Sequence, residues 1–188
     1  VLSWCAVFDA LSQNPKNKIR EWSIISEVIG IIGPRFAESL AAYVATSTSL
    51  TKLSLTGTAF EEQGTRAICD ALKKNKTIQD LELEGDFIGN PGTTAGAEHV
   101  ADMLLVNTSL TKISLARNEL EREGTEAICE ALKVNKKIKE LDLHGFTHFT
   151  GDSNNIGGPE GARHVADMLL VSASLTSLDL SRNYIDQE

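Results

Sequence analysis

The sequence of 188 residues has little of what marks most functional classes. It contains three cysteines, four prolines and 5% aromatic residues, and its formal net charge is −8. Nucleic acids and anionic membranes bind proteins through a basic surface, so we expect neither as a partner. Another protein with a basic surface fits this charge better. No apolar run approaches the ~18 residues that cross a bilayer.

The cysteines are too few, and too irregularly spaced, for a disulfide framework. Cys69 and Cys129 occupy matching positions two repeats apart. That separation exceeds the ~7 Å between Cα atoms that a disulfide bond allows. We therefore expect reduced thiols, together with Cys5, in a cytoplasmic or nuclear protein. The apolar residues 1–8 are too short, and lack the basic residues, for a signal peptide.

Self-similarity is the strongest positive feature of the sequence. Residues 61–85 align without gaps to residues 121–145, and residues 96–115 align to residues 161–180. Each double unit contains a shorter one, in which apolar residues occupy positions 0, 3 and 5 of a short segment. The starts of these segments are 28 to 37 residues apart, which indicates a solenoid. The segments begin near residues 19, 50, 78, 110, 138 and 175.

Two hydrophobic periods within each repeat predict a strand and then a helix. Leu81 and Leu83 alternate with polar neighbours, which is typical of a strand with one buried face. Ala67, Ile68 and Leu72 have the spacing of an amphipathic helix. A strand, a helix and the next strand form a right-handed crossover, so the sheet is parallel. Because a helix is about twice as wide as the ~4.8 Å strand spacing, the stack curves.

These periods predict an α/β fold: a right-handed horseshoe with parallel strands on its concave side and helices on its convex side. The segment 175–183 and the turn at 155–162 resemble the ribonuclease-inhibitor type of leucine-rich repeat. The resemblance covers residues 19–188 and implies a solenoid that binds proteins, commonly through its concave face. The chain differs from the vertebrate inhibitors in having few cysteines and tryptophans, so ribonuclease inhibition is not implied.

No repeat can close its own core, so we expect residues 1–188 to form a single domain. Residues 1–18 predict a capping helix or the second half of an earlier repeat. The repeat that begins near residue 175 is incomplete, because no helix follows its strand. This predicts either a fragment of a longer chain or end-to-end self-association through an uncapped C-terminus.

The concave face is the first candidate site for a partner. Positions 2, 4 and 6 of each strand point away from the core. Acids dominate the strands near residues 80 and 140, whereas Lys52 stands alone in its strand. Such a face favours a basic partner; alternatively, it is the ordinary solvated face of an acidic protein. The candidate residues are Lys52, Asp80, Glu82, Glu84, Lys112, Arg117, Glu140, Asp142, His144, Asp179 and Arg182.

The loops that leave the strands are the second candidate, because insertions cluster there. The longest loop, residues 145–155, places two phenylalanines and a histidine among polar residues. Exposed aromatic side chains are good anchors for a partner, although both rings could instead fold back onto the core. The candidate residues of this rim loop are Phe146, His148, Phe149 and Asp152.

The sequence contains no recognisable catalytic or cofactor motif. His144 and His148 lack a third ligand of the kind that zinc requires, and segment 89–96 lacks the lysine of a phosphate-binding loop. We therefore expect a non-catalytic protein–protein interaction scaffold with no metal and no cofactor. Two alternatives remain open. One is a GTPase regulator, since such repeats also build the GTPase-activating proteins of the Ran system. The other is a structural component assembled end to end.

Overall fold

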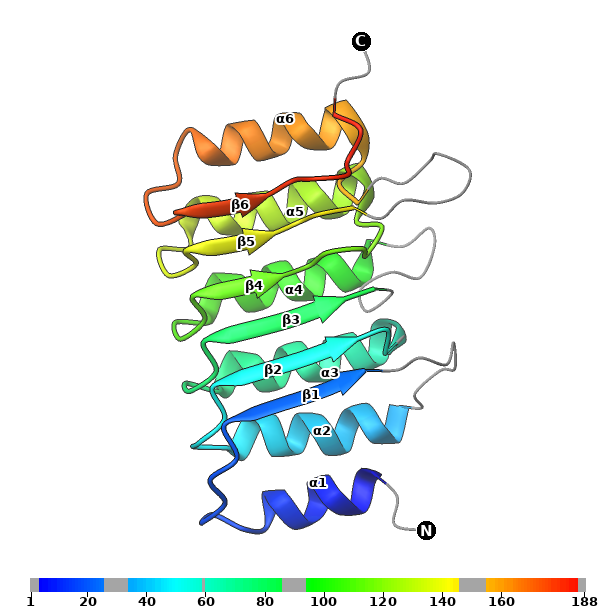
Figure 1. The fold of residues 1–188 in the computed structure, drawn as a ribbon, viewed down its shortest axis with the longest axis vertical. Coiled ribbons are helices and arrows are strands. Elements are labelled where there is room, and N and C mark those ends of the chain that lie inside the picture. Colours follow the sequence, from blue (N-terminus) through cyan, green and yellow to red (C-terminus); the bar gives the residue numbers. More distant parts are fainter. Residues whose placement is uncertain (1–3, 26–33, 59, 86–93, 146–154, 186–188) are drawn as a thin grey trace.

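A computed structural model describes residues 4–25, 34–58, 60–85, 94–145 and 155–185. Within these ranges six helices alternate with six short strands (Figure 1). The helices are α1 (Trp4–Ser12), α2 (Pro34–Thr46), α3 (Glu61–Lys74), α4 (Ala95–Val106), α5 (Glu121–Val134) and α6 (Gly158–Leu169). The strands are β1 (Glu21–Ile25), β2 (Lys52–Thr56), β3 (Asp80–Glu84), β4 (Lys112–Ser114), β5 (Glu140–Asp142) and β6 (Ser177–Asp179).

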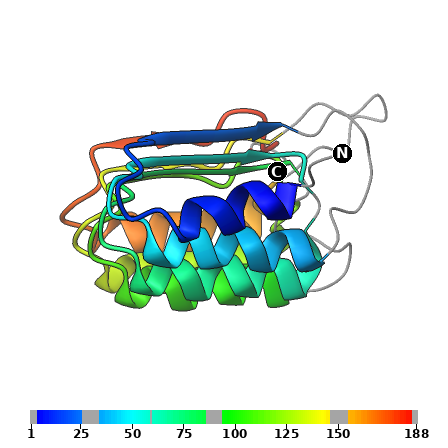
Figure 2. The same cartoon turned by 90° about the horizontal axis from the view of Figure 1, so that it is seen from below.

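The strands form one parallel sheet in sequence order, each paired with the next along the chain. All six helices lie on the same side of this sheet and form a second layer (Figure 2). The predicted α/β solenoid is therefore confirmed. Each strand begins two residues after one of the starts that the repeat pattern gave. None of the described helices is long and apolar enough to cross a membrane.

Leucine pairs on the strands fill the space between the two layers. Leu81 and Leu83 of β3 are fully buried, and so are Ile68 and Leu72 on the inner face of α3. The same positions are buried in the neighbouring repeats, so one hydrophobic cluster runs from α1 to α6. A continuous cluster of this kind couples each repeat to its neighbours.

Helix α1 covers the first end of this cluster with aromatic side chains. Phe8 is fully buried, and its ring centroid lies 5.5 Å from those of both Trp22 and Phe36. Trp4, which is about half exposed, stacks on Phe8 from the outside. Edge-to-face and offset contacts of this kind stabilise the fold beyond the effect of burying apolar area.

Buried asparagines fix the turns that lead from α3, α4 and α5 to the next strand. The Nδ2 amide of Asn75 donates to the main-chain oxygen of Val44, and that of Asn107 to the oxygen of Leu72. Asn135 makes the equivalent bond to Leu104. The Oδ1 atom of each asparagine accepts main-chain N–H groups two and three residues later. Each turn is therefore tied both to itself and to the preceding repeat.

The cysteines give a first testable expectation. All three are free, and burial raises the pKa of the Cys69 and Cys129 thiols to about 12. Because only a thiolate reacts readily, iodoacetamide near neutral pH should modify the partly exposed Cys5 and spare the other two. Peptide mass spectrometry of the native and the urea-unfolded protein measures this. Rapid native labelling of Cys69 would contradict the packing described here.

Candidate functional site

Strand pairing arranges the concave side chains in rows that cross the sheet. The row at the start of the strands alternates in charge, which makes it nearly neutral. Its members, in order, are Glu21, Lys52, Asp80, Lys112 and Glu140, and Ser177 ends the row. Lys52 is the one charged residue of β2, and its Nζ atom lies 3.3 Å from Asp80 and 2.5 Å from Glu82 on the neighbouring β3. Lys112 approaches Asp80 from the other side, at 3.8 Å.

The contact between Lys52 and Glu82 stabilises the charged form of both groups. Its hydrogen bond with Glu82 raises the pKa of Lys52. Burial alone would raise the pKa of Glu82, but hydrogen bonds with Lys52 and Ser54 outweigh burial and lower it. Both side chains are partly exposed, so the pair contributes only ~0–1 kcal/mol to stability. Its main effect is to neutralise this part of the face.

The next row keeps an acidic excess, which is concentrated on the later strands. The hydroxyl of Ser114 lies 3.1 Å from both Glu84 Oε1 and Asp142 Oδ2 and can donate to either. Asp142 is directly paired with Asp179 on β6. The members of this row are Ser23, Ser54, Glu82, Ser114, Asp142 and Asp179.

A hollow of about 120 Å³ opens on the concave face between β4, β5 and β6. Three carboxylates and one ammonium group contribute to its lining, and two aliphatic residues are also present. The charged members are among the residues predicted from the sequence, whereas Ile113, Leu141 and Ser177 are not. Aligning the starts of the repeats places Ser177 beside Glu140. The lining residues are Lys112, Ile113, Glu140, Leu141, Asp142, Ser177 and Asp179.

His144 lies beside this hollow, close to the carboxylates of Asp142 and Asp179. Its ring Nδ1 is 2.9 Å from Asp142 Oδ1, which also accepts the main-chain N–H of His144. The main-chain N–H of Ser181 donates to Asp179 and lowers the pKa of that carboxyl group. Asp142, His144 and Asp179 can each offer one ligand atom to a divalent cation, within 4.8 Å of one another. This grouping was not predicted from the sequence, because Asp179 comes from the next strand.

The remaining predicted residues fall into two groups. Arg117 and Arg182 occupy equivalent exposed positions after β4 and β6, with φ angles of 59° and 60°. The main-chain N–H of Arg117 donates to the oxygen of His144, so the turn that carries Arg117 is tied to the next repeat. The candidate rim-loop residues Phe146, His148, Phe149 and Asp152 lie outside the described residues.

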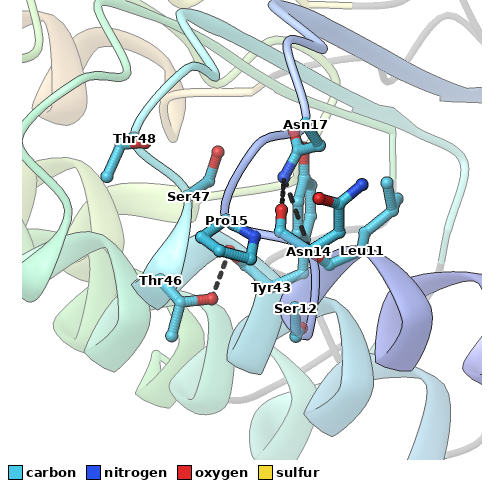
Figure 3. A pocket seen from close by; sticks show the side chains of 9 residues that line it. All are labelled: Leu11, Ser12, Asn14, Pro15, Asn17, Tyr43, Thr46, Ser47 and Thr48. Atoms are coloured by element: carbon cyan, nitrogen blue, oxygen red, sulfur yellow. Dashed lines mark hydrogen bonds between the residues drawn. The ribbon is translucent and has the colours of Figure 1, made fainter.

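A second hollow, of about 160 Å³, lies near the N-terminus, between the turn after α1 and the end of α2 (Figure 3). The amide of Asn17 crosses this turn, donating to the oxygens of Asn14 and Leu11. Tyr43 donates to Asn17 from α2. The lining offers hydrogen-bonding groups but no acidic or basic side chain, in contrast with the concave hollow.

The sequence is similar to those of known leucine-rich-repeat proteins. A family model described as "Leucine Rich repeat" matches residues 106–129 and 171–188. "NACHT, LRR and PYD domains-containing protein 5" of Bos taurus is 31% identical over 81% of this chain. The ribonuclease inhibitor of Sus scrofa is 28% identical over 73% of it. The matched regions span only 13% and 28% of the lengths of those two proteins.

Comparisons of structure give the same fold at low sequence identity. "Leiomodin-1 Actin-Binding Site 2" superimposes with a TM-score of 0.64 at 19% identity, covering 90% of each chain. The tropomodulin C-terminal domain of Caenorhabditis elegans gives 0.62 at 14% identity, covering 90% of this chain and 92% of the other. At these identities the likeness is one of fold alone.

Proposed function

Because the chain belongs to the leucine-rich-repeat family, of the ribonuclease-inhibitor type, we propose that it is a non-catalytic scaffold that binds another protein through its concave face. By its name, the related ribonuclease inhibitor acts on another protein, which supports this choice of partner class. The observation that carries the proposal is the acidic hollow between β4, β5 and β6.

The rigidity of the concave face suits it to recognition. Its charged rows stand on paired strands whose other face is anchored in the core by residues such as Leu141 and Ile113. A preformed surface loses little conformational entropy when a partner binds, which favours affinity. The partner can therefore be recognised by the fixed spacing of the charges.

The charges of the hollow favour a basic group. Glu140, Asp142 and Asp179 line it together with a single ammonium group, that of Lys112. An arginine of the partner fits best, because its planar guanidinium pairs with two carboxylate oxygens at once. Asp142 and Asp179 are the natural pair for this contact, since strand pairing puts them side by side.

The strand-to-helix rim extends the proposed surface. Arg117 and Arg182 lie at this rim, and the longest insertion, residues 145–155, begins at the same edge. In the proposal, Phe146, His148, Phe149 and Asp152 make the outer contacts with the partner. The free cysteines favour a reducing compartment, so we place the complex in the cytoplasm or the nucleus.

The variant Asp142→Asn/Asp179→Asn tests the concave site. It keeps the shape of both side chains but removes two charges, so affinity for a basic partner should fall about tenfold. Peptides selected from a random display library by the wild-type protein provide the partner, and calorimetric titration at several salt concentrations measures binding. We expect arginine-containing peptides whose affinity falls as salt rises.

The matched control is Asp102→Asn/Asp167→Asn, which changes charge equally at exposed residues of α4 and α6. It should leave the affinity of these peptides within about twofold, because exposed charges beyond a Debye length of about 8 Å are screened. Equal losses in both variants would contradict the concave site. Regulation of a GTPase and end-to-end assembly remain the alternatives to this function.

A further inference from the structure

One edge of the solenoid carries basic residues but no acidic ones. We define the helix-end rim as the turns from each helix to the next strand together with the last helical residues: 11–20, 45–51, 73–79, 105–111, 133–139 and 168–176. These turns share one edge of the solenoid, on the left in Figure 1. None of the 26 acidic residues lies there, but ten of the 18 basic residues do. They are Lys16, Lys18, Arg20, Lys73, Lys74, Lys76, Lys133, Lys136, Lys137 and Lys139.

The six turns form a continuous and fixed surface. Main-chain hydrogen bonds of 2.7–2.9 Å join each turn to the one before it. Asn75, Asn107 and Asn135 also fix the third, fourth and fifth turns internally. The members of this ladder, in order, are Arg20, Thr51, Gln79, Thr111, Lys139 and Thr176. The turns that carry the basic residues are therefore held in a line across the repeats.

Basic turns alternate with turns that carry no charge. The first, third and fifth turns hold all ten basic residues, whereas the second, fourth and sixth hold none. The fourth and sixth turns instead expose large apolar side chains. These are Leu105, Val106, Leu170 and Val171, all more than half exposed. Apolar side chains grouped on a charged edge are typical of a binding surface.

Helix dipoles account for only part of this pattern. Lys76 and Lys136 donate to the oxygens of Lys73 and Lys133 at the ends of α3 and α5, where a positive charge is favourable. Helices α4 and α6 have no basic residue in their last turn. Lys139 lies five residues beyond the end of α5, where the effect of the dipole has faded. The helix dipoles therefore explain neither the lack of basic residues in the turns after α4 and α6 nor the presence of Lys139.

We propose that the helix-end rim binds an acidic segment of a partner protein, in extended form, with apolar side chains between its acidic ones. The acidic side chains face the basic turns and the apolar ones meet the exposed leucines and valines. From the first to the fifth turn the rim spans about 20 Å at the strand spacing and about 40 Å at the helix spacing. An extended segment of about six to twelve residues covers this distance.

The narrowness of the basic band favours a single chain over a broad anionic surface. Three acids, Asp70, Asp102 and Glu130, lie four residues before the ends of α3, α4 and α5, about 6 Å back along each helix. Asp167 lies two residues before the end of α6. On the concave side Glu21, Asp80 and Glu140 directly follow the basic turns. Both rows lie within a Debye length of about 8 Å, so they would repel an anionic membrane laid across the rim.

Nucleic acid fits the rim less well than protein does. Its six segments contain no aromatic residue on which a base could stack, and only one of its ten basic residues is an arginine. Lysines held in a line beside exposed leucines instead match the carboxylates and apolar side chains of a peptide.

The test uses the full chain and a display library of random peptides of about twelve residues, which extend to about 40 Å. We expect the library to yield, besides any basic peptides of the concave face, acidic peptides with interspersed apolar residues. Affinity for the acidic peptides should fall at least about tenfold in Lys136→Glu/Lys137→Glu/Lys139→Glu and should weaken as salt rises. Circular dichroism confirms that each variant is folded.

The control variant Arg66→Glu/Arg122→Glu/Arg163→Glu makes the same change in net charge at exposed helical residues away from the rim. It should keep the affinity for acidic peptides within about twofold. Equal losses in both variants, or a library that yields no acidic peptide, overturns the proposal. The proposal is also overturned if the protein binds phosphatidylserine vesicles or single-stranded DNA more tightly than the acidic peptides and the rim variant abolishes that binding. Asp142→Asn/Asp179→Asn should leave acidic peptides bound, which separates this rim from the concave face.

Discussion

Replacing Asn75 with alanine should lower the free energy of unfolding by about 3 kcal/mol, because one buried side chain satisfies four main-chain groups. Its Nδ2 amide donates to the oxygens of Val44 and Ser47, at 2.8 and 3.3 Å. Its Oδ1 atom accepts the N–H groups of Thr77 and Ile78, both at 2.8 Å. Alanine leaves these groups without partners in a site that is only 2% exposed.

Urea unfolding followed by circular dichroism measures this loss. Asn14→Ala is the matched control, because Asn14 is exposed and its side-chain oxygen accepts the N–H of the nearby Lys16. We expect the control to change the free energy of unfolding by less than about 0.5 kcal/mol. If the two variants were equally stable, the side-chain hydrogen bonds of Asn75 would not be what holds its turn in place.

Replacing Leu143 with alanine should destabilise the protein by about 3 to 4 kcal/mol, because the leucine is fully buried between sheet and helices. The loss combines the transfer of the removed methyl groups with the cavity left in a close-packed core. Leu170→Ala is the control: that leucine is 83% exposed, and its removal should cost less than about 0.5 kcal/mol. The shift in the urea midpoint measures both losses, provided that the dependence of the free energy of unfolding on urea concentration is unchanged. A small effect at Leu143 would contradict the continuous core.

The repeat pattern was sufficient to predict the layers and the strand positions. Leucine pairs such as Leu81 and Leu83 are strictly alternating, and only a strand buries both on one face. The helical spacing of Ile68 and Leu72 was equally clear. Because every repeat carries the same two signals, an error in one repeat would have been corrected by the others.

Contacts between repeats were harder to predict, because they join residues about one repeat apart. The bonds from Lys52 to Asp80 and Glu82 bridge neighbouring strands, so Lys52 looked isolated in its own segment. Asp179 likewise meets Asp142 and His144 only through strand pairing. Aligning the starts of the repeats predicts which residues form one row across the sheet. The distances between their side chains depend on how those side chains pack.

Net charge was the least informative signal. A value of −8 predicts a basic partner, but it averages over a helix-end rim that holds no acid at all. A concave acid and a rim lysine can be direct neighbours in the sequence, as at Lys139 and Glu140, yet Lys139 lies in a turn of the rim and Glu140 begins strand β5. The rim-loop residues Phe146, His148, Phe149 and Asp152 stay predictions, since they lie outside the described residues.

Both proposed surfaces depend on a single body, because only a shared core can hold six turns and six strands in fixed rows. The tryptophans allow this to be measured: both of them, Trp4 and Trp22, lie at the N-terminal end, and Leu143 lies near the other end. In urea, tryptophan fluorescence and far-ultraviolet circular dichroism should give coincident transitions. Leu143→Ala should shift both transitions equally. A tryptophan transition that stays in place while the circular dichroism transition moves would show two separate cores and contradict the single solenoid.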